Sequence, residues 1–390
     1  MLQEFQPQAL YAAFDVYPTA KGASTHIYHF AQALFEWKEK GWLHVLGSPK
    51  LPLYQQEKDW VITRFYEDIS NFLLRTRAYG NHLYALLKGT SLEMAHFRDP
   101  WSGFPILHYQ EVSSAFPCIY EVNGLPSIEL PYRYPRVSPQ TLKKIEEMEQ
   151  FCLNRASAII CPSASIRDHL IRRGCPAQKI KVIYNGADVP ETLERPEEAP
   201  GQYLLYFGAL QSWQGVDSLL KSLPYLSDFE DLKLVICVSN RPKFSRPLVK
   251  LAEKLGLSER IIWKYQLPKK ELYNWVHFAQ LTLAPLRECS RNLEQGCCPL
   301  KILESLALAT PVIAANIPAV REIMGEEDQF GLLVRPDRPA EMARSIRLML
   351  ENPKARKEMG IRGKQHIQEH FLWENKKKEL QDHYTRILPP

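Results

Sequence analysis

Short apolar runs alternate with helical patterns along most of the 390 residues, and this alternation limits the folds open to the chain. In the first half, helical patterns over 69–88 and 138–156 separate several of the runs. The apolar runs lie at residues 10–16, 42–47, 60–66, 93–97, 118–122, 158–163 and 181–185. A strand–helix rhythm of this kind predicts a parallel sheet with helices on both faces.

The same rhythm begins again after residues 191–202, a polar and proline-rich stretch without apolar periodicity. Such a stretch is typical of an interdomain linker. The second set of predicted strands starts with YLLYFG and continues at residues 232–239, 260–265, 281–285, 311–315 and 331–336. Because 390 residues suit two domains better than one, we predict an α/β protein with two Rossmann-like domains facing a cleft.

Composition narrows the class of protein. A hydrophobic content of 45% and a charged content of 24% are ordinary for a soluble globular chain, and no apolar run reaches transmembrane length. With no signal-peptide pattern and eight scattered Cys, we expect reduced thiols in the cytoplasm. The net charge of +5 comes without a basic stripe interleaved with aromatics, so no nucleic-acid partner is expected. The 69–88 helix, with Arg75 and Arg77, leaves peripheral membrane contact open, although an ordinary packed helix is favoured.

Residues 296–316, GCCPLKILESLALATPVIAAN, carry the strongest chemical signal. Pro299 suits a first helical turn, and Lys301 and Glu304 follow on one side of that helix. A helix N-terminus attracts phosphate and Lys301 adds a cation, while the Glu304 carboxylate suits a pair of ribose hydroxyls. A lone Lys-x-x-Glu pair is by itself more simply a surface salt bridge.

The run PLKILESLALATPVIA resembles the donor-site helix of the family 4 retaining glycosyltransferases (glycosyl transferases group 1), which have the GT-B fold. NRASAIICPSASIRDHL with KVIYNGADV resembles the end of that family's first domain, and FLWENKKKELQDHYTRIL resembles its last helix. The resemblance implies an acceptor-binding domain over 1–190 and a nucleotide-sugar-binding domain over 200–370. A C-terminal helix over 371–390 would cross back to the first domain.

The resemblance implies a retaining, metal-independent hexosyltransferase. It would move a sugar from a nucleotide-diphosphate sugar to a hydroxyl of a glycan or lipid-linked acceptor. Family members of this kind often build cell-surface or extracellular polysaccharide at the cytoplasmic face of the membrane, and the resemblance implies no cofactor besides the co-substrate. A non-catalytic member that binds a sugar nucleotide or a partner is the alternative. A nicotinamide dehydrogenase is disfavoured, because G-x-G-x-x-G is absent, and no D-x-D pair at a strand end predicts a metal.

The resemblance also implies the site residues. The catalytic group would be Lys301, Glu304 and Asn123. Besides Lys301 and Glu304, the donor would be bound by Gly208, Gln214, Gln266, Leu267, Arg287, Glu294, Gly296, Cys297, Cys298, Pro299 and Leu300. Together with Asn123, the acceptor would be bound by Lys21, Gly22, His26, His96 and Arg98. The segments 96–99 and 123–126 are chosen because they follow strands, where ligands bind to open sheets, and a turn-forming or capping role is an equally good explanation for each residue alone.

The chain departs from the family pattern at the expected donor site. The family's E-x7-E pair would place a first Glu at Gly296, and Glu294, two residues earlier, could serve only if the loop bulges. The family's G-R-L-x-x-x-K-G loop reads G-A-L-Q-S-W-Q-G, so Ala209 and Gln214 stand where two cations are expected. Lys301 and the helix N-terminus should therefore neutralise a larger share of the diphosphate charge.

Overall fold

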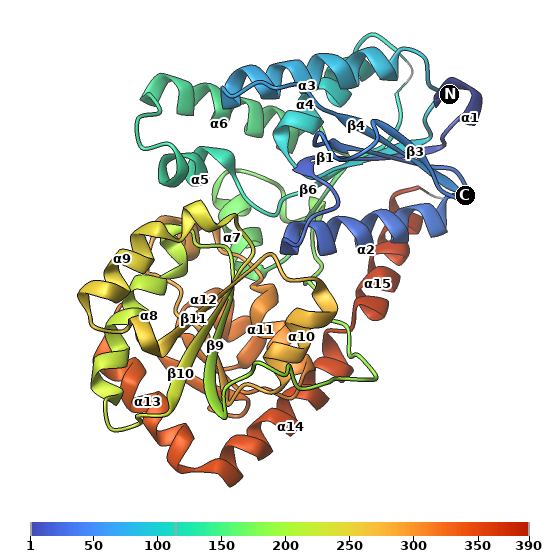
Figure 1. Ribbon diagram of the computed structural model, residues 1–390. Coiled ribbons are helices and arrows are strands. Elements are labelled where there is room, and N and C mark those ends of the chain that lie inside the picture. The colour runs from blue at the N-terminus through green and yellow to red at the C-terminus, as the bar shows by residue number, and fades with distance from the viewer. Residues whose placement is uncertain (1, 114, 389–390) are drawn as a thin grey trace. The chain divides into compact units, whose positions relative to one another are not determined.

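The chain folds into two compact units in the computed structural model, which describes residues 2–113 and 115–388 (Figure 1). The first unit consists of Met1–Thr19, Ala23–Ile183 and Lys376–Pro390, and the second of Ala20–Gly22 and Tyr184–Asn375. Each unit contains its own sheet, built mainly from parallel strands. Both units are therefore of the α/β type that the alternation of strands and helices predicts.

Within its described residues, the first unit has an eight-stranded sheet in the order β3-β4-β2-β1-β5-β6-β7-β8. Its strands pair in parallel, except that β3 is antiparallel to β4. The strands are β1 (Ala9–Val16), β2 (Gly41–Leu46), β3 (Tyr54–Gln56), β4 (Trp60–Phe65), β5 (Met94–Phe97), β6 (Cys118–Glu121), β7 (Ala158–Cys161) and β8 (Ile180–Val182). The central strands are buried on both faces, which explains why they are continuous apolar runs in the sequence.

Helices cover both faces of this sheet. The helices of the first unit before residue 184 are α1 (Leu2–Phe5), α2 (Gly22–Trp37), α3 (Phe72–Leu87), α4 (Pro100–Gln110), α5 (Pro126–Arg133), α6 (Pro139–Arg155) and α7 (Ala164–Arg172). In Figure 1, α3 and α4 lie on one side of the strands and α2 on the other. Asn71, Asp99, Ser138 and Ser163 each accept a backbone N–H at a helix start, so local capping residues define where α3, α4, α6 and α7 begin.

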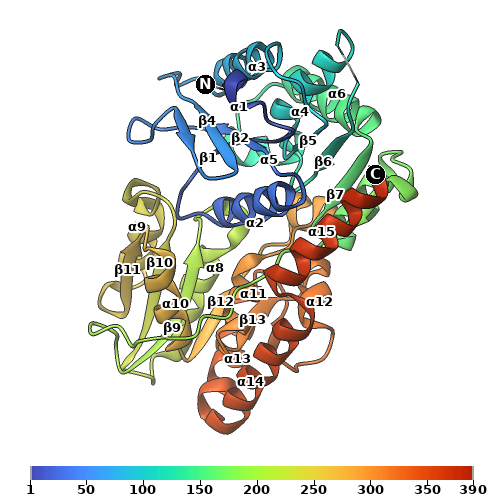
Figure 2. The same cartoon turned by 90° about the vertical axis from the view of Figure 1, so that its right-hand side faces the viewer.

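The last helix, α15 (Trp373–Ile387), packs against α2 in the first unit (Figure 2). Gln381 Nε2 donates to the carbonyl of Ala33 at 3.1 Å, and Trp37 Nε1 donates to Thr385 Oγ1 at 3.1 Å. Tyr384 is fully buried. The return of the C-terminal helix to the first unit agrees with the fold that the sequence resemblance implied.

The second unit has, across the residues described, a six-stranded parallel sheet in the order β11-β10-β9-β12-β13-β14. Its strands are β9 (Gln202–Gly208), β10 (Leu232–Val238), β11 (Ile261–Tyr265), β12 (Leu281–Ala284), β13 (Val312–Ala315) and β14 (Gly331–Val334). Its helices are α8 (Val216–Ser222), α9 (Arg246–Lys254), α10 (Lys269–His277), α11 (Leu300–Ala307), α12 (Pro318–Met324), α13 (Pro339–Glu351) and α14 (Pro353–His370). This strand order is that of a doubly wound nucleotide-binding sheet.

Strand order fixes where ligands can bind in each unit. In an open parallel sheet, ligands bind beyond the carboxyl ends of the strands, at the point where the connections change direction. That point lies between β1 and β5 in the first unit and between β9 and β12 in the second. Functional side chains are therefore expected in the loops that follow these four strands.

None of the helices among the described residues is both long enough and apolar enough to cross a membrane.

Candidate active site

The loop after β9 forms one wall of the expected donor site. Gly208 has a φ of 126°, and Ser212–Gln214 form a single 3₁₀ turn. Gly215 follows with a φ of 68° and begins α8. A Cβ atom on Gly215 would lie 1.8 Å from the carbonyl oxygen of Pro285, so glycine is needed there. The loop after β9 is thus packed directly on the loop after β12.

Lys301, on the first turn of α11, points into the loop after β9. Its Nζ donates to Gln214 Oε1 at 2.6 Å and lies 4.0 Å from the centre of the Tyr206 ring. Burial lowers the pKa of Lys301 to about 7, because an ammonium loses hydration in such a place. The structure therefore brings together two side chains, Lys301 and Gln214, that the sequence placed on one diphosphate.

Glu304 lies one turn further along α11. Burial raises the pKa of its carboxyl to about 7, while the charge of Lys269 and the hydroxyl of Tyr273 act in the opposite direction. Lys269 itself pairs with Asp188 at 2.7 Å. A half-buried carboxylate beside other polar groups can accept hydrogen bonds from ligand hydroxyls, as the predicted role requires. Contact of Glu304 with a ribose stays a prediction.

The segment before α11 makes a wide turn. Arg291–Gln295 form a π-helical turn, which the N–H of Gly296 closes by donating to the Arg291 carbonyl at 3.1 Å. Glu294 is exposed on this turn, whereas Gln295 is fully buried. The loop therefore has the kind of bulge that Glu294 would need in order to serve as the first Glu of the family pair. A direct contact of Glu294 with a sugar stays a prediction.

Residues 296–299 connect this turn to the N-terminus of α11. Pro299 occupies the N-cap, so α11 starts at Leu300. Cys297 and Cys298 are both buried, and the carbonyl of Cys298 accepts Asn185 Nδ2 at 2.8 Å. Donor binding by this segment would use backbone N–H groups at the positive end of the helix.

Arg287 lies at the border of the same loops, and two carboxylates already balance its charge. Its guanidinium pairs with Asp217 at 2.5 Å and with Asp337 at 3.2 Å. Its backbone N–H donates to the carbonyl of Trp213 at 3.0 Å. To bind a diphosphate, Arg287 would have to share these ion pairs. These ion pairs and this hydrogen bond show how Arg287 helps to hold the two loops. Donor binding by Arg287 stays a prediction.

The turn predicted to meet the nucleotide base follows β11. Gln266 is exposed with a φ of 52°, and its N–H donates to the carbonyl of Val238 at 2.8 Å. Leu267 packs, partly buried, against the core under β9 and α10. The backbone of this turn is accordingly fixed, and its role in base binding remains a prediction.

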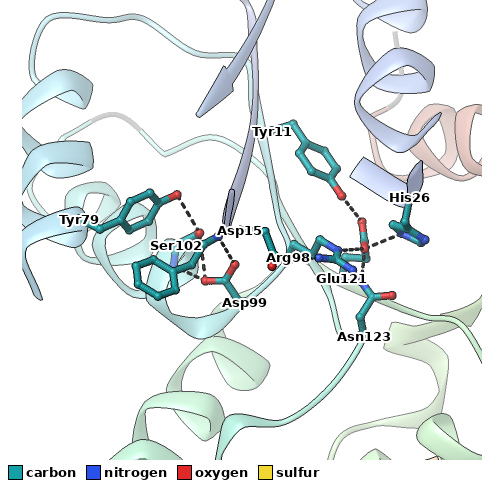
Figure 3. Close-up of polar contacts among 10 residues, drawn as sticks. Tyr11, Asp15, His26, Tyr79, Arg98, Asp99, Ser102, Glu121 and Asn123 are labelled. Atoms are coloured by element: carbon teal, nitrogen blue, oxygen red, sulfur yellow. Dashed lines mark hydrogen bonds and ion pairs between the residues drawn. The ribbon is translucent and has the colours of Figure 1, made fainter. Parts of the chain in front are cut away.

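A buried carboxylate, Glu121, organises the switch point of the first unit (Figure 3). It ends β6 and is 1% exposed. Side chains from β1, α2, β5 and the loops after β5 and β6 surround it. They are Tyr11 (Oη to Oε2, 2.7 Å), His26 (Nε2 to Oε1, 2.7 Å), His96 (Nε2 to Oε2, 3.0 Å), Arg98 (Nε to Oε1, 3.3 Å) and Asn123, whose Nδ2 donates to Oε1.

These partners determine the charge of Glu121. Burial would raise the pKa of the carboxyl, but ion pairing with His26 and His96 holds it well below its usual range. A second carboxylate, Asp15, pairs with Arg98 at 2.5 Å, and its side chain is 42% exposed. Burial would lower the pKa of Arg98, but the two carboxylates raise it overall. The cluster therefore joins a buried anion to a more exposed one through a single guanidinium.

Asp99 fixes the loop beside this cluster (Figure 3). Its carboxylate accepts the N–H of Phe14 at 2.6 Å and the N–H of Ser102 at 2.8 Å. Burial raises the pKa of Asp99 to about 6, against the effect of these hydrogen bonds. Ser102 also lies 3.1 Å from the hydroxyl of Tyr79. Asp99 thus ties the ends of β1 and β5 together while it caps α4.

The predicted acceptor residues fall into two groups. Lys21 and Gly22 are exposed where α2 begins. His26 and His96 are 2% and 0% exposed, and His96 Nδ1 also lies 2.7 Å from the hydroxyl of Tyr384. In this structure the two histidines are interior partners of Glu121 and present almost no surface to an acceptor. Direct acceptor binding through them stays a prediction.

The sequence did not single out Glu121, Asp15 or Tyr206. Glu121 carries a weak signal, because it is an acidic residue at the end of an otherwise apolar strand, CIYE. Tyr206 carries none, because an aromatic residue in a buried strand is ordinary. No group of three or more His, Cys, Asp or Glu positioned to hold a metal ion occurs in the described part of the chain.

Two α/β units, each with polar groups at the switch point of its sheet, define the two-domain GT-B class. Two family descriptions match the sequence, Glycosyltransferase Family 4 over residues 20–191 and Glycosyl transferases group 1 over residues 191–366. The two matches together cover most of the chain. The chain belongs to glycosyltransferase family 4.

Curated relatives agree with this family. The chain is 27% identical over 275 residues to a D-inositol 3-phosphate glycosyltransferase of Streptomyces bingchenggensis, a match that covers 64% of this chain and 57% of the relative. It is 24% identical over 213 residues to an MMP alpha-(1->4)-mannosyltransferase of Mycolicibacterium hassiacum, covering 55% and 50%. The chain thus spans about half the length of these two relatives.

Solved structures share the fold. Sucrose-phosphate synthase from Thermosynechococcus elongatus has a TM-score of 0.79 at 17% identity, covering 97% of this chain and 99% of the other. Alr3699/HepE of Anabaena, in complex with UDP-glucose, has a TM-score of 0.76 at 14% identity, covering 97% and 99%. At this identity the likeness concerns the fold.

Proposed function

We propose that the protein is a retaining glycosyltransferase that moves a sugar from a nucleotide-diphosphate sugar to a hydroxyl of a glycan or lipid-linked acceptor, in the synthesis of cell-surface or extracellular polysaccharide. The observation that carries the proposal is the placement of Lys301. This half-buried lysine lies at the N-terminus of α11, and its ammonium contacts the loop after β9, at the switch point of the second sheet. The UDP-glucose bound to the Anabaena protein, which has the same fold, supports a sugar nucleotide as the donor.

The second unit supplies the donor contacts in this proposal. Backbone N–H groups near the start of α11 and the Lys301 ammonium bind the diphosphate. Glu304 accepts hydrogen bonds from the ribose hydroxyls, and the backbone at Gln266 meets the base. The Gln214 side-chain oxygen accepts from Lys301, so its amide nitrogen can donate to a phosphate oxygen.

The chemistry requires charge stabilisation more than a protein nucleophile. The bond between the anomeric carbon and the diphosphate oxygen breaks, and a bond to the acceptor oxygen forms. The acceptor hydroxyl gives its proton to an oxygen of the departing diphosphate, on which negative charge grows as the bond breaks. Fixed cations and dipoles at that position lower the barrier, because they bind the transition state more strongly than the ground state.

The first unit holds the acceptor side in this proposal. Asn123 is half-buried and fixed by Glu121, so its amide can be presented to the reacting sugars in one orientation. Arg98 is held between Glu121 and Asp15, while Lys21, an exposed cation counted with the second unit, immediately precedes α2. Peripheral contact with the inner membrane face would bring a lipid-linked acceptor to this unit.

One observation favours the alternative, a non-catalytic protein that binds a sugar nucleotide. Ala209 and Gln214 replace two cations of the family pattern, which lowers the positive charge available to the leaving group. Incubation with a panel of UDP-, GDP-, ADP- and TDP-sugars separates the two proposals. Release of nucleoside diphosphate by the wild-type protein supports transfer, whereas binding of a donor without release supports the alternative.

Activity should not depend on a divalent metal. The proposed site neutralises the leaving diphosphate with Lys301 and helix N–H groups, so no metal is needed for that step. We expect nucleoside diphosphate release to persist after treatment with EDTA and desalting. Loss of activity that magnesium or manganese restores would contradict this expectation, and an EDTA-treated sample supplemented with calcium serves as the control.

The pH dependence of kcat/KM for the donor should be a narrow bell near pH 7. As pH rises through about 7, Lys301 loses the charge that binds the diphosphate. As pH falls through about 7, Glu304 takes up a proton and loses an acceptor for the ribose. kcat/KM therefore falls on both sides of pH 7, because both ionisations take place in the free enzyme. In Lys301→Arg the alkaline limb should move to higher pH, because a guanidinium stays charged, and an unchanged alkaline limb would argue against Lys301 as its source.

A further inference from the structure

Tyr206 lies directly beneath the Lys301 ammonium in the second unit. It belongs to β9 and is fully buried. The Lys301 Nζ lies 4.0 Å from the centre of its ring, close enough for a strong cation–π contact. Gly208 follows two residues later on the same face of the strand. A Cβ at position 208 would lie 3.5 Å from Nζ, an ordinary van der Waals contact, so the backbone of the loop after β9 lies directly beside the ammonium.

The Tyr206 hydroxyl fixes the orientation of this ring. It donates to the carbonyl of Ala209 at 2.7 Å and lies 3.4 Å from Gln214 Oε1. The shorter contact is the stronger hydrogen bond. Tyr206 thus anchors the loop after β9 by its hydroxyl, while its ring faces Lys301.

We propose that Tyr206 is the positioning residue that keeps the Lys301 ammonium charged and aimed at the donor diphosphate, compensating for the cations replaced by Ala209 and Gln214. The aim at a diphosphate rests on the proposed function. An ammonium has three N–H donors. Gln214 Oε1 takes one, and the face of the Tyr206 ring stabilises the charge from another side. An N–H group of Lys301 is thereby left to meet a phosphate oxygen.

An ammonium that has lost part of its hydration needs such support. Burial lowers the pKa of Lys301 to about 7, so about half of the population is charged at pH 7 and a further loss of stabilisation would leave most of it neutral. A desolvated cation–π contact is worth about 2 kcal/mol, a factor of about thirty in the protonation equilibrium. The free energy of the contact with the Tyr206 ring is thus large enough to decide whether Lys301 is charged near pH 7.

The competing explanation is that Tyr206 only fills the core. It does pack in the apolar cluster that includes Leu204, Val216 and Leu283. Tyr203 offers a matched control, because it lies in the same strand, is equally buried, and donates its hydroxyl to the Trp275 carbonyl at 2.8 Å. It packs in a different cluster, on the opposite face of the strand.

The test measures the protonation of Lys301 directly. Trace labelling of the intact protein with acetic anhydride over a range of pH, read by mass spectrometry of the Lys301 peptide, gives the pKa of that amine without any donor. We expect Tyr206→Phe to match wild type. Tyr206→Leu should increase the labelling of Lys301 near pH 6 by about tenfold, because a larger fraction of the amine is neutral. Tyr203→Leu should behave as wild type.

A fluorinated series keeps the test decisive where Tyr206→Leu does not fold. Phenylalanine analogues carrying one, two and three ring fluorines at position 206 keep the size of the ring and progressively weaken its negative face. The pKa of Lys301 should fall stepwise along the series. Equal pKa values along it, or equal shifts in Tyr206→Leu and Tyr203→Leu, would overturn the proposal.

Turnover connects this result to catalysis. At pH 7, Tyr206→Leu should lower kcat/KM for the donor about tenfold more than Tyr203→Leu, and Tyr206→Phe should retain most of it. Equal losses of kcat/KM in Tyr206→Leu and Tyr203→Leu would overturn the role of Tyr206 toward the diphosphate. If the labelling shifts as expected while the donor panel shows no release by wild type, it is the proposed function that fails, and the effect of Tyr206 on the Lys301 charge stands.

Discussion

Lys301→Met is expected to lower kcat by about a hundredfold or more, with a smaller change in donor affinity. The substitution keeps the length of the side chain and removes its charge. Negative charge develops on the leaving diphosphate in the transition state, so a cation placed there contributes more to turnover than to ground-state binding. The replacement of two further cations by Ala209 and Gln214 increases the share carried by Lys301. Steady-state nucleoside diphosphate release measures the effect, and Lys250→Met, in the exposed face of α9, is the matched control.

A second substitution makes the placement of Lys301 testable. Because Lys301 Nζ lies 2.6 Å from Gln214 Oε1, Gln214→Lys in the wild-type background adds a second ammonium beside the first, and its effect on turnover should be small. In the Lys301→Met background the same change supplies a cation at that place and should restore part of the lost turnover. The two changes are therefore expected to be strongly non-additive. Simple additivity would mean that positions 214 and 301 do not serve one phosphate.

Glu304→Ala should abolish detectable transfer while the fold stays intact. The ribose would lose a carboxylate that accepts from its hydroxyls, at a cost of about 2–4 kcal/mol in donor binding or rate. Stability should not fall, because burial already disfavours the charged form of this carboxyl. Calorimetric titration with the nucleoside diphosphate, together with the thermal unfolding midpoint, measures both effects. Unchanged turnover in a purified, folded Glu304→Ala protein would remove Glu304 from the site.

The strands and the donor helix were predictable because their signals are local. Parallel strands buried on both faces are continuous apolar runs, as in β1, β2 and β9, and these coincide with or overlap the predicted segments. The α4 helix was not predicted, because PWSGFPILHYQ contains Gly103 and Pro105 inside the helix. The Asp99 cap and tertiary packing override those weak local preferences.

The Glu121 cluster was not predictable, because its members come from distant parts of the chain. Tyr11, His26 and His96 reach Glu121 from β1, α2 and β5, and no sequence spacing links them. Neighbouring parallel strands bring their carboxyl ends to one edge, and only the strand order shows which loops meet there. The same reason applies to Tyr206, whose role depends on a lysine almost a hundred residues away. The sequence therefore led to His26 and His96 as candidate acceptor residues. It did not show that both contact the carboxylate of Glu121.

Hydrogen exchange tests the central claim most directly, namely that the loop after β9 and the start of α11 hold a nucleoside diphosphate. The full chain is compared with and without saturating UDP, GDP or ADP, and exchange is followed peptide by peptide. We predict that at least one of these nucleotides protects peptides covering residues 207–215 and 296–306, and that Glu304→Ala weakens this protection. Protection of neither segment by any of the nucleotides, or protection confined to other parts of the chain, would contradict the account.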